Sequence, residues 1–423
     1  MDVTPAEVEA VFRSEAGAAL ATLARLVGDV GLAQDAVQDA FVEALRAWPA
    51  RGRPRNPGAW ITTTARNRAL DHLRRESRRP VRETTAAREA MVAALEATPS
   101  ELHPVTDDQL RMMFTCCHPS LSRDAQVALT LRLVCGLRTA EIARALLQSE
   151  PTITKRLQRA KGKIRDAAIP LRVPPPDLLP ERVPPVLDCV YLVFGEGYAA
   201  TGGDELIRHA LCDEAIRLTR TLAALLPDVA EVRGLLALLL LHDSRRSTRL
   251  DAAGDLVVLE LQDRSGWDRD RISEGVSLLR SALSTGPSGP FATQAAIAAE
   301  HATSPSWEAT DWRRIVDLYG ILDPSGRSAV VQLNLAVATA FADGPEAGLR
   351  LLDQLEDDRR TGRSHLLPAA RGDLLRRMGR YEEAAAAYRA ALDRAATRPE
   401  RHFLERRLHE VRSTPDVSSP DGR

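Results

Sequence analysis

Apolar residues recur at helical spacing along most of this 423-residue chain, and this pattern constrains the fold more than any other feature. Near the N-terminus, for example, the repeating set is Val8, Val11, Phe12, Leu20 and Leu23. Ala, Leu and Arg, which are strong helix formers, dominate the composition, whereas runs of β-branched residues are scarce. The sequence therefore predicts an all-α protein, and its length suits several domains rather than one core.

Segments rich in proline and glycine divide the chain. The stretch from Pro49 to Gly58 holds three prolines and two glycines and is expected to be irregular. A second stretch, from Pro170 to Pro185, is expected to be a stiff linker. The expected organisation is a helical module at 5–79, a linker at 80–106, a second helical module at 107–167, a proline-rich linker at 168–185, a helical domain at 186–412 and a disordered tail at 413–423.

Positive charge is concentrated in two patches, although the net charge of the chain is only −1. Residues 66–82 contain seven Arg against Asp71 and Glu76, and residues 152–165 contain six Lys or Arg and no acid. Two dense basic patches in a nearly neutral chain indicate local binding to a polyanion instead of non-specific electrostatic association over the whole surface.

The first patch lies on a helix expected from residue 59 to about 78. Arg66, Arg74 and Arg75 can neutralise phosphates there, whereas Trp60 and Ile61 are expected to pack in the core. The preceding helix, expected at 32–48, carries Asp35, Gln38 and Asp39 on one face, where they can meet a basic partner together. Taken alone, the pattern of that preceding helix is better explained by an ordinary amphipathic helix on the surface.

The second patch lies on a predicted helix-turn-helix, formed by residues 139–147 and 151–167. Ser149 is the expected N-cap of its second helix, with Pro151 in the first turn. Ile153, Leu157, Ala160 and Ile164 are expected to face inward. The residues expected to face outward (the outward set) are Thr152, Thr154, Lys155, Arg156, Arg159 and Lys161. The alternative, a solvated basic helix with no ligand, explains this concentration of positive charge less well.

The two modules, in this order and joined by a linker, resemble an extracytoplasmic-function (ECF) RNA polymerase sigma factor over roughly residues 7–167. The resemblance implies a reversible partner of core RNA polymerase that supplies promoter specificity and helps to melt DNA. It implies neither catalysis nor a cofactor, and no metal. Residues 35–75 resemble sigma region 2, and the helix-turn-helix resembles sigma region 4, whose second helix enters the major groove of the −35 element.

The resemblance also implies roles for individual residues. Asn67 matches the residue beside a captured base of the melted −10 element, where an amide can donate and accept. Lys155 or Arg159 could read guanine edges. The expected polymerase-binding residues are Asp35, Gln38 and Asp39; the −10 set is Asn56, Arg66, Asn67, Arg74 and Arg75; and the −35 set is the outward set of the second helix.

The C-terminal half resembles the extension of one ECF group that carries a long helical, tetratricopeptide-like domain. The motifs are Phe114-Thr-Cys-Cys-His-Pro119, Gly195-Glu-Gly-Tyr198, Leu241-His-Asp-Ser-Arg-Arg246 and Gln262-Asp-Arg-Ser-Gly-Trp267, with Gly195 where Asn is expected. Tetratricopeptide spacing is clearest at Gly372, Gly379, Tyr381, Ala384, Tyr388 and Ala391, although Arg371 replaces the preferred Leu. We expect this domain to regulate activity through contact with a regulatory protein or with other parts of the complex.

Several polar residues of the C-terminal half are candidates for a binding groove: Glu196, Tyr198, His242, Asp243, Arg246 and Asp263. A metal or hydrolase site is an alternative, but such clusters more often join helix ends or line a groove. For the whole chain, the alternative function is a helix-turn-helix regulator that acts without polymerase, with a C-terminal partner- or ligand-binding domain.

The five cysteines show no metal-ligand spacing and are expected to be buried reduced thiols, which fits a cytoplasmic protein. The longest apolar run is too short to span a bilayer, so no membrane partner is expected.

Overall fold

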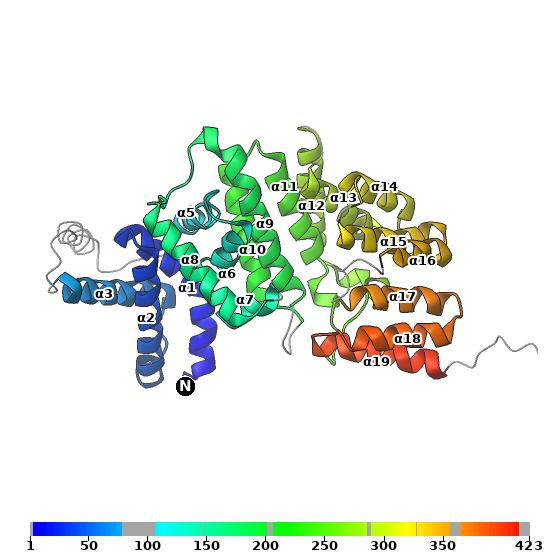
Figure 1. Cartoon of the computed structure of the whole chain (residues 1–423), viewed down its shortest axis with the longest axis horizontal. Helices are drawn as coiled ribbons and strands as arrows, with labels where there is room; N and C mark the ends of the chain where they lie inside the picture. The colour runs from blue at the N-terminus through cyan, green and yellow to red at the C-terminus, as the bar shows by residue number, and fades with distance from the viewer. Residues whose placement is uncertain are drawn as a thin grey trace, which may run out of the picture. The chain divides into compact units, whose positions relative to one another are not determined.

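The computed structural model describes residues 3–77, 106–146, 148–200, 206–285, 289–326, 328–355 and 364–413. Within these ranges every regular element is a helix, and the only bridge is an isolated one between Leu250 and Leu256 (Figure 1). The all-α prediction is therefore confirmed. None of the described helices is both long and apolar enough to cross a membrane. The predicted linker at 80–106 and the predicted tail lie almost wholly outside the described residues.

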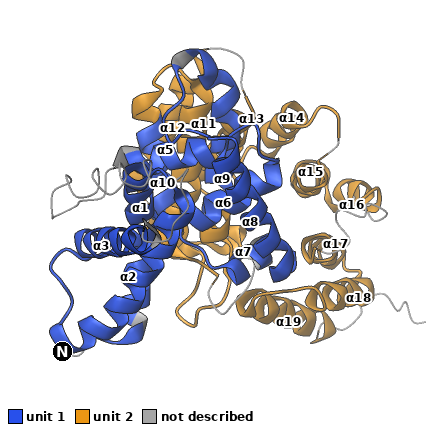
Figure 2. Ribbon diagram, turned by 60° about the vertical axis from the view of Figure 1, so that its left-hand side comes forward, with its two compact units in different colours: residues 1–194, 213–222 blue, residues 195–212, 223–423 orange. Residues whose placement is uncertain are grey.

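The chain divides into two compact units, coloured separately in Figure 2. The first unit comprises residues 1–194 and 213–222, and the second comprises residues 195–212 and 223–423. Both predicted promoter-reading modules thus fall within one unit. Helices α9 (Leu179–Tyr198) and α10 (His209–Leu225) contribute residues to both units.

The first unit begins with three helices that pack on one another: α1 (Pro5–Val27), α2 (Val30–Arg51) and α3 (Pro57–Ser77). Thr4 and Glu7 form a capping box at the start of α1, and Asp29 caps α2 by accepting a hydrogen bond from the Leu32 amide. Between these two helices, Gly28 has φ 69°, a left-handed conformation that glycine adopts without strain. Local capping signals therefore fix the first turn of the module.

The loop predicted from Pro49 to Gly58 is shorter in the structure. Helix α2 continues to Arg51 with Pro49 in its last turns, and α3 already begins at Pro57, so only residues 52–56 are irregular. Trp48 is almost fully buried and packs edge-on against Trp60, with ring centroids 5.3 Å apart. This packing holds the end of α2 helical despite the proline, whereas a proline in the first turn of α3 costs nothing.

The second module has four helices: α5 (Thr106–Cys116), α6 (Arg123–Leu133), α7 (Thr139–Ala145) and α8 (Glu150–Asp166). Helices α7 and α8 form the predicted helix-turn-helix, and α6 packs against both. The module also packs against α1, chiefly through α5. An ideal Cβ added to Gly17 of α1 would lie 1.9 Å from the carbonyl oxygen of Val134, so the backbones of α1 and of the end of α6 touch.

The proline-rich linker predicted at 168–185 ends earlier than expected, because α9 starts at Leu179 and includes Pro184 and Pro185. Tertiary contacts hold this helix in place: the Arg182 guanidinium donates to the Phe114 carbonyl oxygen, and Cys189 is buried against Cys117, with their sulfurs 3.6 Å apart. Packing within the first unit therefore overrides the local preference of proline.

The second unit continues with helices packed on their neighbours in sequence. Helix α11 (Ala230–Asp243), which is buried on nearly all sides, packs against α12 (Arg269–Leu283) and α13 (Pro290–Thr303). The remaining helices are α14 (Trp312–Leu322), α15 (Ala329–Asp343), α16 (Pro345–Asp353), α17 (Leu366–Arg377), α18 (Tyr381–Leu392) and α19 (Arg398–Ser413).

Two of the helix pairs in the second unit pack through glycine. A Cβ on Gly372 of α17 would lie 2.8 Å from the ring of Tyr388 on α18. A Cβ on Gly348 of α16 would lie 2.5 Å from the Cβ of Ala340 on α15. Such close pairs are what the tetratricopeptide spacing predicts, although membership of that repeat class stays a prediction.

Candidate nucleic-acid interface

Helix α8 presents a basic face to solvent. Its inward residues are those predicted from the spacing, since Ile153, Leu157, Ala160 and Ile164 are all buried. Ser149 caps the helix by accepting a hydrogen bond from the Thr152 amide, as predicted. Four of the six outward residues predicted for the −35 element are exposed: Thr152, Thr154, Lys155 and Arg159. This face is unobstructed within the first unit and can meet a polyanion.

The other two predicted −35 residues are engaged inside the first unit. The Arg156 guanidinium pairs with Asp124 of α6 at 3.0 Å. The Lys161 ammonium donates to Gln34 of α2, and burial lowers the pKa of Lys161, which Asp35 and Asp29 partly oppose. The structure therefore separates the outward set into an exposed part and a part that joins α8 to its neighbours.

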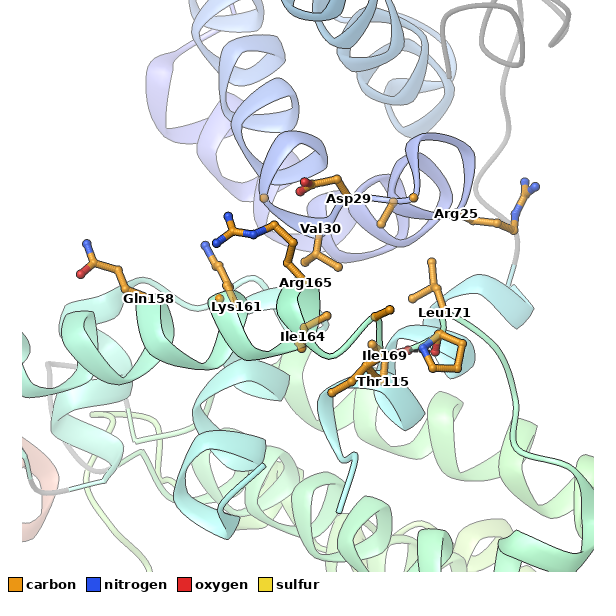
Figure 3. A pocket seen from close by; sticks show the side chains of 16 residues that line it. Arg25, Asp29, Val30, Thr115, Gln158, Lys161, Ile164, Arg165, Ile169 and Leu171 are labelled. Atoms are coloured by element: carbon orange, nitrogen blue, oxygen red, sulfur yellow. Dashed lines mark hydrogen bonds between the residues drawn. The ribbon is translucent and has the colours of Figure 1, made fainter. Parts of the chain in front are cut away.

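A cavity of about 580 Å³ lies beside Lys161, between α8 and the turn that joins α1 to α2 (Figure 3). Asp29 and Arg25 border it on the side of the turn, and Arg165 borders it on the side of α8. Its wall also includes apolar side chains such as Ile164. The two modules thus meet across a partly charged gap, which Lys161 bridges.

Helix α3 brings part of the predicted −10 set together. Asn67, Arg74 and Arg75 are exposed, as predicted. Arg66 is only 8% exposed and its guanidinium lies 3.4 Å from the Asn67 side-chain oxygen, so it does not join the exposed set. Asn56, in the preceding loop, is exposed, and its side-chain oxygen accepts a hydrogen bond from the Ala59 amide at 3.0 Å.

The outer face of α2 is partly apolar, a feature that the predicted polymerase-binding set does not include. Asp35 and Gln38 are exposed, whereas Asp39 is half-buried and lies 2.9 Å from His72. Val42 is 45% exposed and Leu45 36% exposed, and both continue the stripe of Asp35 and Gln38 at helical spacing. Val42 and Leu45 lie four and seven residues after Gln38, and this helical spacing is the sequence signal that could have placed them on the same face.

Most polar candidates of the second unit are engaged in ion pairs, hydrogen bonds or ring contacts with neighbouring side chains. Glu196 is buried and pairs with Arg208 at 2.8 Å, while the buried Asp243 pairs with both Arg246 and Arg271. Asp263 is exposed and caps a short turn by accepting a hydrogen bond from the Ser265 amide. No cluster of His, Cys, Asp and Glu suited to a metal ion occurs among the residues that the structure describes.

Tyr198 and His242 lie beside these ion pairs, with ring centroids 5.6 Å apart. Arg249 stacks on the Tyr198 ring, with its guanidinium carbon 3.8 Å from the centroid. Burial and the nearby Arg245 and Arg249 guanidiniums lower the pKa of His242 to about 3, so this histidine is neutral near pH 7.

Comparisons with known families match three parts of the chain. Residues 11–79 match Sigma-70 region 2, residues 111–164 match Sigma-70 region 4, and residues 182–283 match a family of unknown function (DUF6596). An uncharacterized protein, R00370 of Rhizobium meliloti (strain 1021), is 40% identical over 403 residues, which is 94% of each chain.

Two relatives of known class each match about a third of the chain. The RNA polymerase sigma-H factor of Pseudomonas aeruginosa is 31% identical over 159 residues, covering 36% of this chain and 81% of that protein. The ECF RNA polymerase sigma-E factor of Escherichia coli K12 is 30% identical over 148 residues, covering 34% of this chain and 76% of that protein. The Sigma-70 region 2 and region 4 matches fall on the two modules whose geometry is described above, and the chain belongs to the ECF RNA polymerase sigma factors, which direct transcription.

Proposed function

We propose that this chain binds core RNA polymerase in the cytoplasm and directs it to promoters, with α8 on the duplex −35 element and α3 on the melted −10 element. The observation that carries the −35 assignment is the exposed set of Thr152, Thr154, Lys155 and Arg159 on the face of α8 opposite its buried residues. A helix of this kind fits the major groove and can contact both base edges and phosphates.

The proposed −10 contacts come from α3. The exposed guanidiniums of Arg74 and Arg75 can bind phosphates, and the amide of Asn67 can pair with the edge of an unstacked base. Because Arg66 is buried beside Asn67, we assign it to positioning Asn67 instead of binding phosphate directly. Asn56 orders the start of α3 through its cap, at the edge of the irregular loop.

The proposed polymerase contact is the outer stripe of α2. Asp35 and Gln38 supply polar contacts, and the exposed Val42 and Leu45 supply apolar area that a solvated helix has little reason to display. Polar and apolar groups in one continuous stripe suit a reversible protein interface.

We also propose that the helical C-terminal domain regulates the sigma modules through protein–protein contact. Stacked helix pairs such as α15–α16 and α17–α18 build extended surfaces for partner proteins, which supports this role. The proposed function needs no catalytic step by this chain.

The first test is run-off transcription with core RNA polymerase and full-length protein on candidate promoters. We expect specific transcripts from the wild type and from Arg394→Ala, an exposed arginine of the second unit, but not from Lys155→Ala/Arg159→Ala or Asn67→Ala. Binding of duplex promoter DNA without polymerase, and no transcript with it, would instead mark a helix-turn-helix regulator.

The second test follows hydrogen exchange of the full chain with and without core polymerase. We expect slower exchange in α2 and in helices of the second unit after α13, because the proposed contacts would cover them. Exchange that slows in α2 alone would overturn the regulatory role through contact with the complex and leave the sigma role standing.

A further inference from the structure

A cluster of cationic side chains surrounds Tyr198 in the second unit. The Arg249 guanidinium lies 3.8 Å from the centre of the tyrosine ring, and the Arg245 guanidinium lies 5.6 Å from it. A terminal nitrogen of Arg245 is 3.4 Å from Nδ1 of His242. All of these side chains are at least partly shielded from solvent.

Arg264 adds a third guanidinium to this cluster. It donates to the carbonyl oxygens of His301 and Ser304, at 2.5 Å and 2.8 Å, and it is close enough to Arg245 to be repelled by it. Arg264 also stacks 4.7 Å above the ring of Trp267. These contacts fix where its charge lies.

The backbone beneath the cluster is tied together by hydrogen bonds. Trp267 donates its indole N–H to Thr248 at 3.0 Å, and Arg249 donates to the Tyr198 carbonyl oxygen. The turn that carries Arg245 and Arg249 is therefore joined to the loop that carries Arg264, and the three guanidiniums are held in place before any ligand arrives.

Neighbouring arginines form ion pairs with carboxylates, whereas the one acidic group that acts on this cluster is Glu308, which is close enough to Arg264 to attract it without forming an ion pair. Arg208 pairs with Glu196 at 2.8 Å, and both Arg246 and Arg271 pair with Asp243. Among the ion pairs of the described residues, none brings a carboxylate within 4.0 Å of Arg245, Arg249 or Arg264. Positive charges that are partly shielded from water without an ion-pair partner are unfavourable, and Arg245 and Arg249 place two of them against one tyrosine ring, with Arg264 as a third nearby.

The two histidines of the cluster carry no charge of their own near pH 7. The pKa of His242 is lowered to about 3 by burial and by Arg245 and Arg249. The pKa of His301 is lowered to about 4 by burial and by Arg245 and Arg264. Both histidines therefore stay neutral near pH 7, and the surplus charge is that of the guanidiniums.

We propose that Arg245, Arg249 and Arg264 form a binding site for a small phosphate-bearing anion. Guanidinium groups donate paired hydrogen bonds to phosphate oxygens and remain charged at any physiological pH. Three guanidiniums carry more positive charge than a single carboxylate neutralises, so a phosphate dianion suits the site better than a carboxylate. The ligand is either free phosphate or the phosphoryl group of a small metabolite, and the site gives the C-terminal domain a chemical signal to respond to.

Thermal unfolding of the full-length protein with inorganic phosphate, against chloride at equal ionic strength, tests the proposal. We expect the unfolding midpoint to rise with phosphate, by roughly 5–10 °C at a hundred times the dissociation constant. Arg245→Gln should weaken binding at least about tenfold, whereas Arg245→Lys should retain part of it. Arg380→Gln, which removes an exposed arginine paired with Glu383, should bind like the wild type.

A second readout separates binding from packing. In buffer without phosphate, Arg245→Gln should unfold at the same temperature as the wild type or above it, because the substitution removes repulsion. Destabilisation there would show that Arg245 only packs against Tyr198 and would overturn the proposal. So would a wild type that does not respond to phosphate, pyrophosphate or sugar phosphates, or that responds to acetate and citrate alone. A response to sugar phosphates stronger than to phosphate would identify a metabolite as the ligand.

Discussion

Replacing Gly17 by alanine tests the packing of the two sigma modules within the first unit. Alanine is favoured over glycine in a helix interior by about 1 kcal/mol, so without an opposing contact the substitution would stabilise the protein. The new Cβ would lie 1.9 Å from the Val134 carbonyl oxygen, whereas real Cβ atoms stay beyond 3.0 Å. Backbone on both sides must then separate by about 1 Å, and such overpacking costs about 1–3 kcal/mol.

The matched control is Gly320→Ala in α14, where an added Cβ meets no atom within 4 Å. The control should gain about 0.5–1 kcal/mol, and Gly17→Ala should fall about 1–3 kcal/mol below it. Urea unfolding gives the free energies, and hydrogen exchange of α1 and α6 shows whether the loss is local to their contact. If Gly17→Ala stabilises the protein as much as the control does, α1 does not touch the end of α6 and the reasoning is wrong.

Three further predictions concern single groups. Gly372→Ala should destabilise the second unit by about 1–2 kcal/mol in urea, because its Cβ would press on the Tyr388 ring at 2.8 Å, and a gain in stability would contradict the packing. The stability of the second unit should fall as the pH drops from about 6.5 towards 4. In the folded protein the pKa of His242 is about 3 and that of His301 about 4, so the unfolded chain binds protons first and is favoured. His242→Gln should make the unfolding midpoint depend less on pH, and a wild type whose midpoint does not change with pH would refute the assignment. All five cysteines are buried, so a thiol reagent should label the native protein only at the rate of unfolding, and rapid labelling would show an exposed thiol.

Local signals in the sequence place most helices correctly. The Ser149 cap followed by Pro151 predicts the start of α8 to within one residue, and the apolar spacing within it gives the buried face. The proline-rich segment before residue 186 is the main error, because Pro184 and Pro185 lie inside α9. Proline signals a break only where nothing else holds the backbone, and here contacts with the second module do.

The site could be predicted only in part, because a side chain's role depends on what covers it. Exposure of Lys155 and Arg159 follows from the periodicity of α8 itself, and it was predicted. The engagement of Lys161 with Gln34 depends on a helix more than a hundred residues earlier, and no local pattern encodes it. The unpaired charge of Arg245 and Arg249 likewise depends on which carboxylates the neighbouring arginines take.

The hydrogen bond between Lys161 and Gln34 and the contact of α1 with α5 hold the two modules of the first unit together. This closed arrangement lowers the affinity for any partner that binds the modules only when they are apart. A partner that needs α8 apart from α2 binds only the fraction of molecules in which the two are already separated, so its apparent affinity is reduced by that fraction. Each increment of about 1.4 kcal/mol in the free energy that favours the closed arrangement lowers this apparent affinity about tenfold. A signal that shifts this equilibrium would change the binding of such a partner without altering any residue proposed to contact DNA.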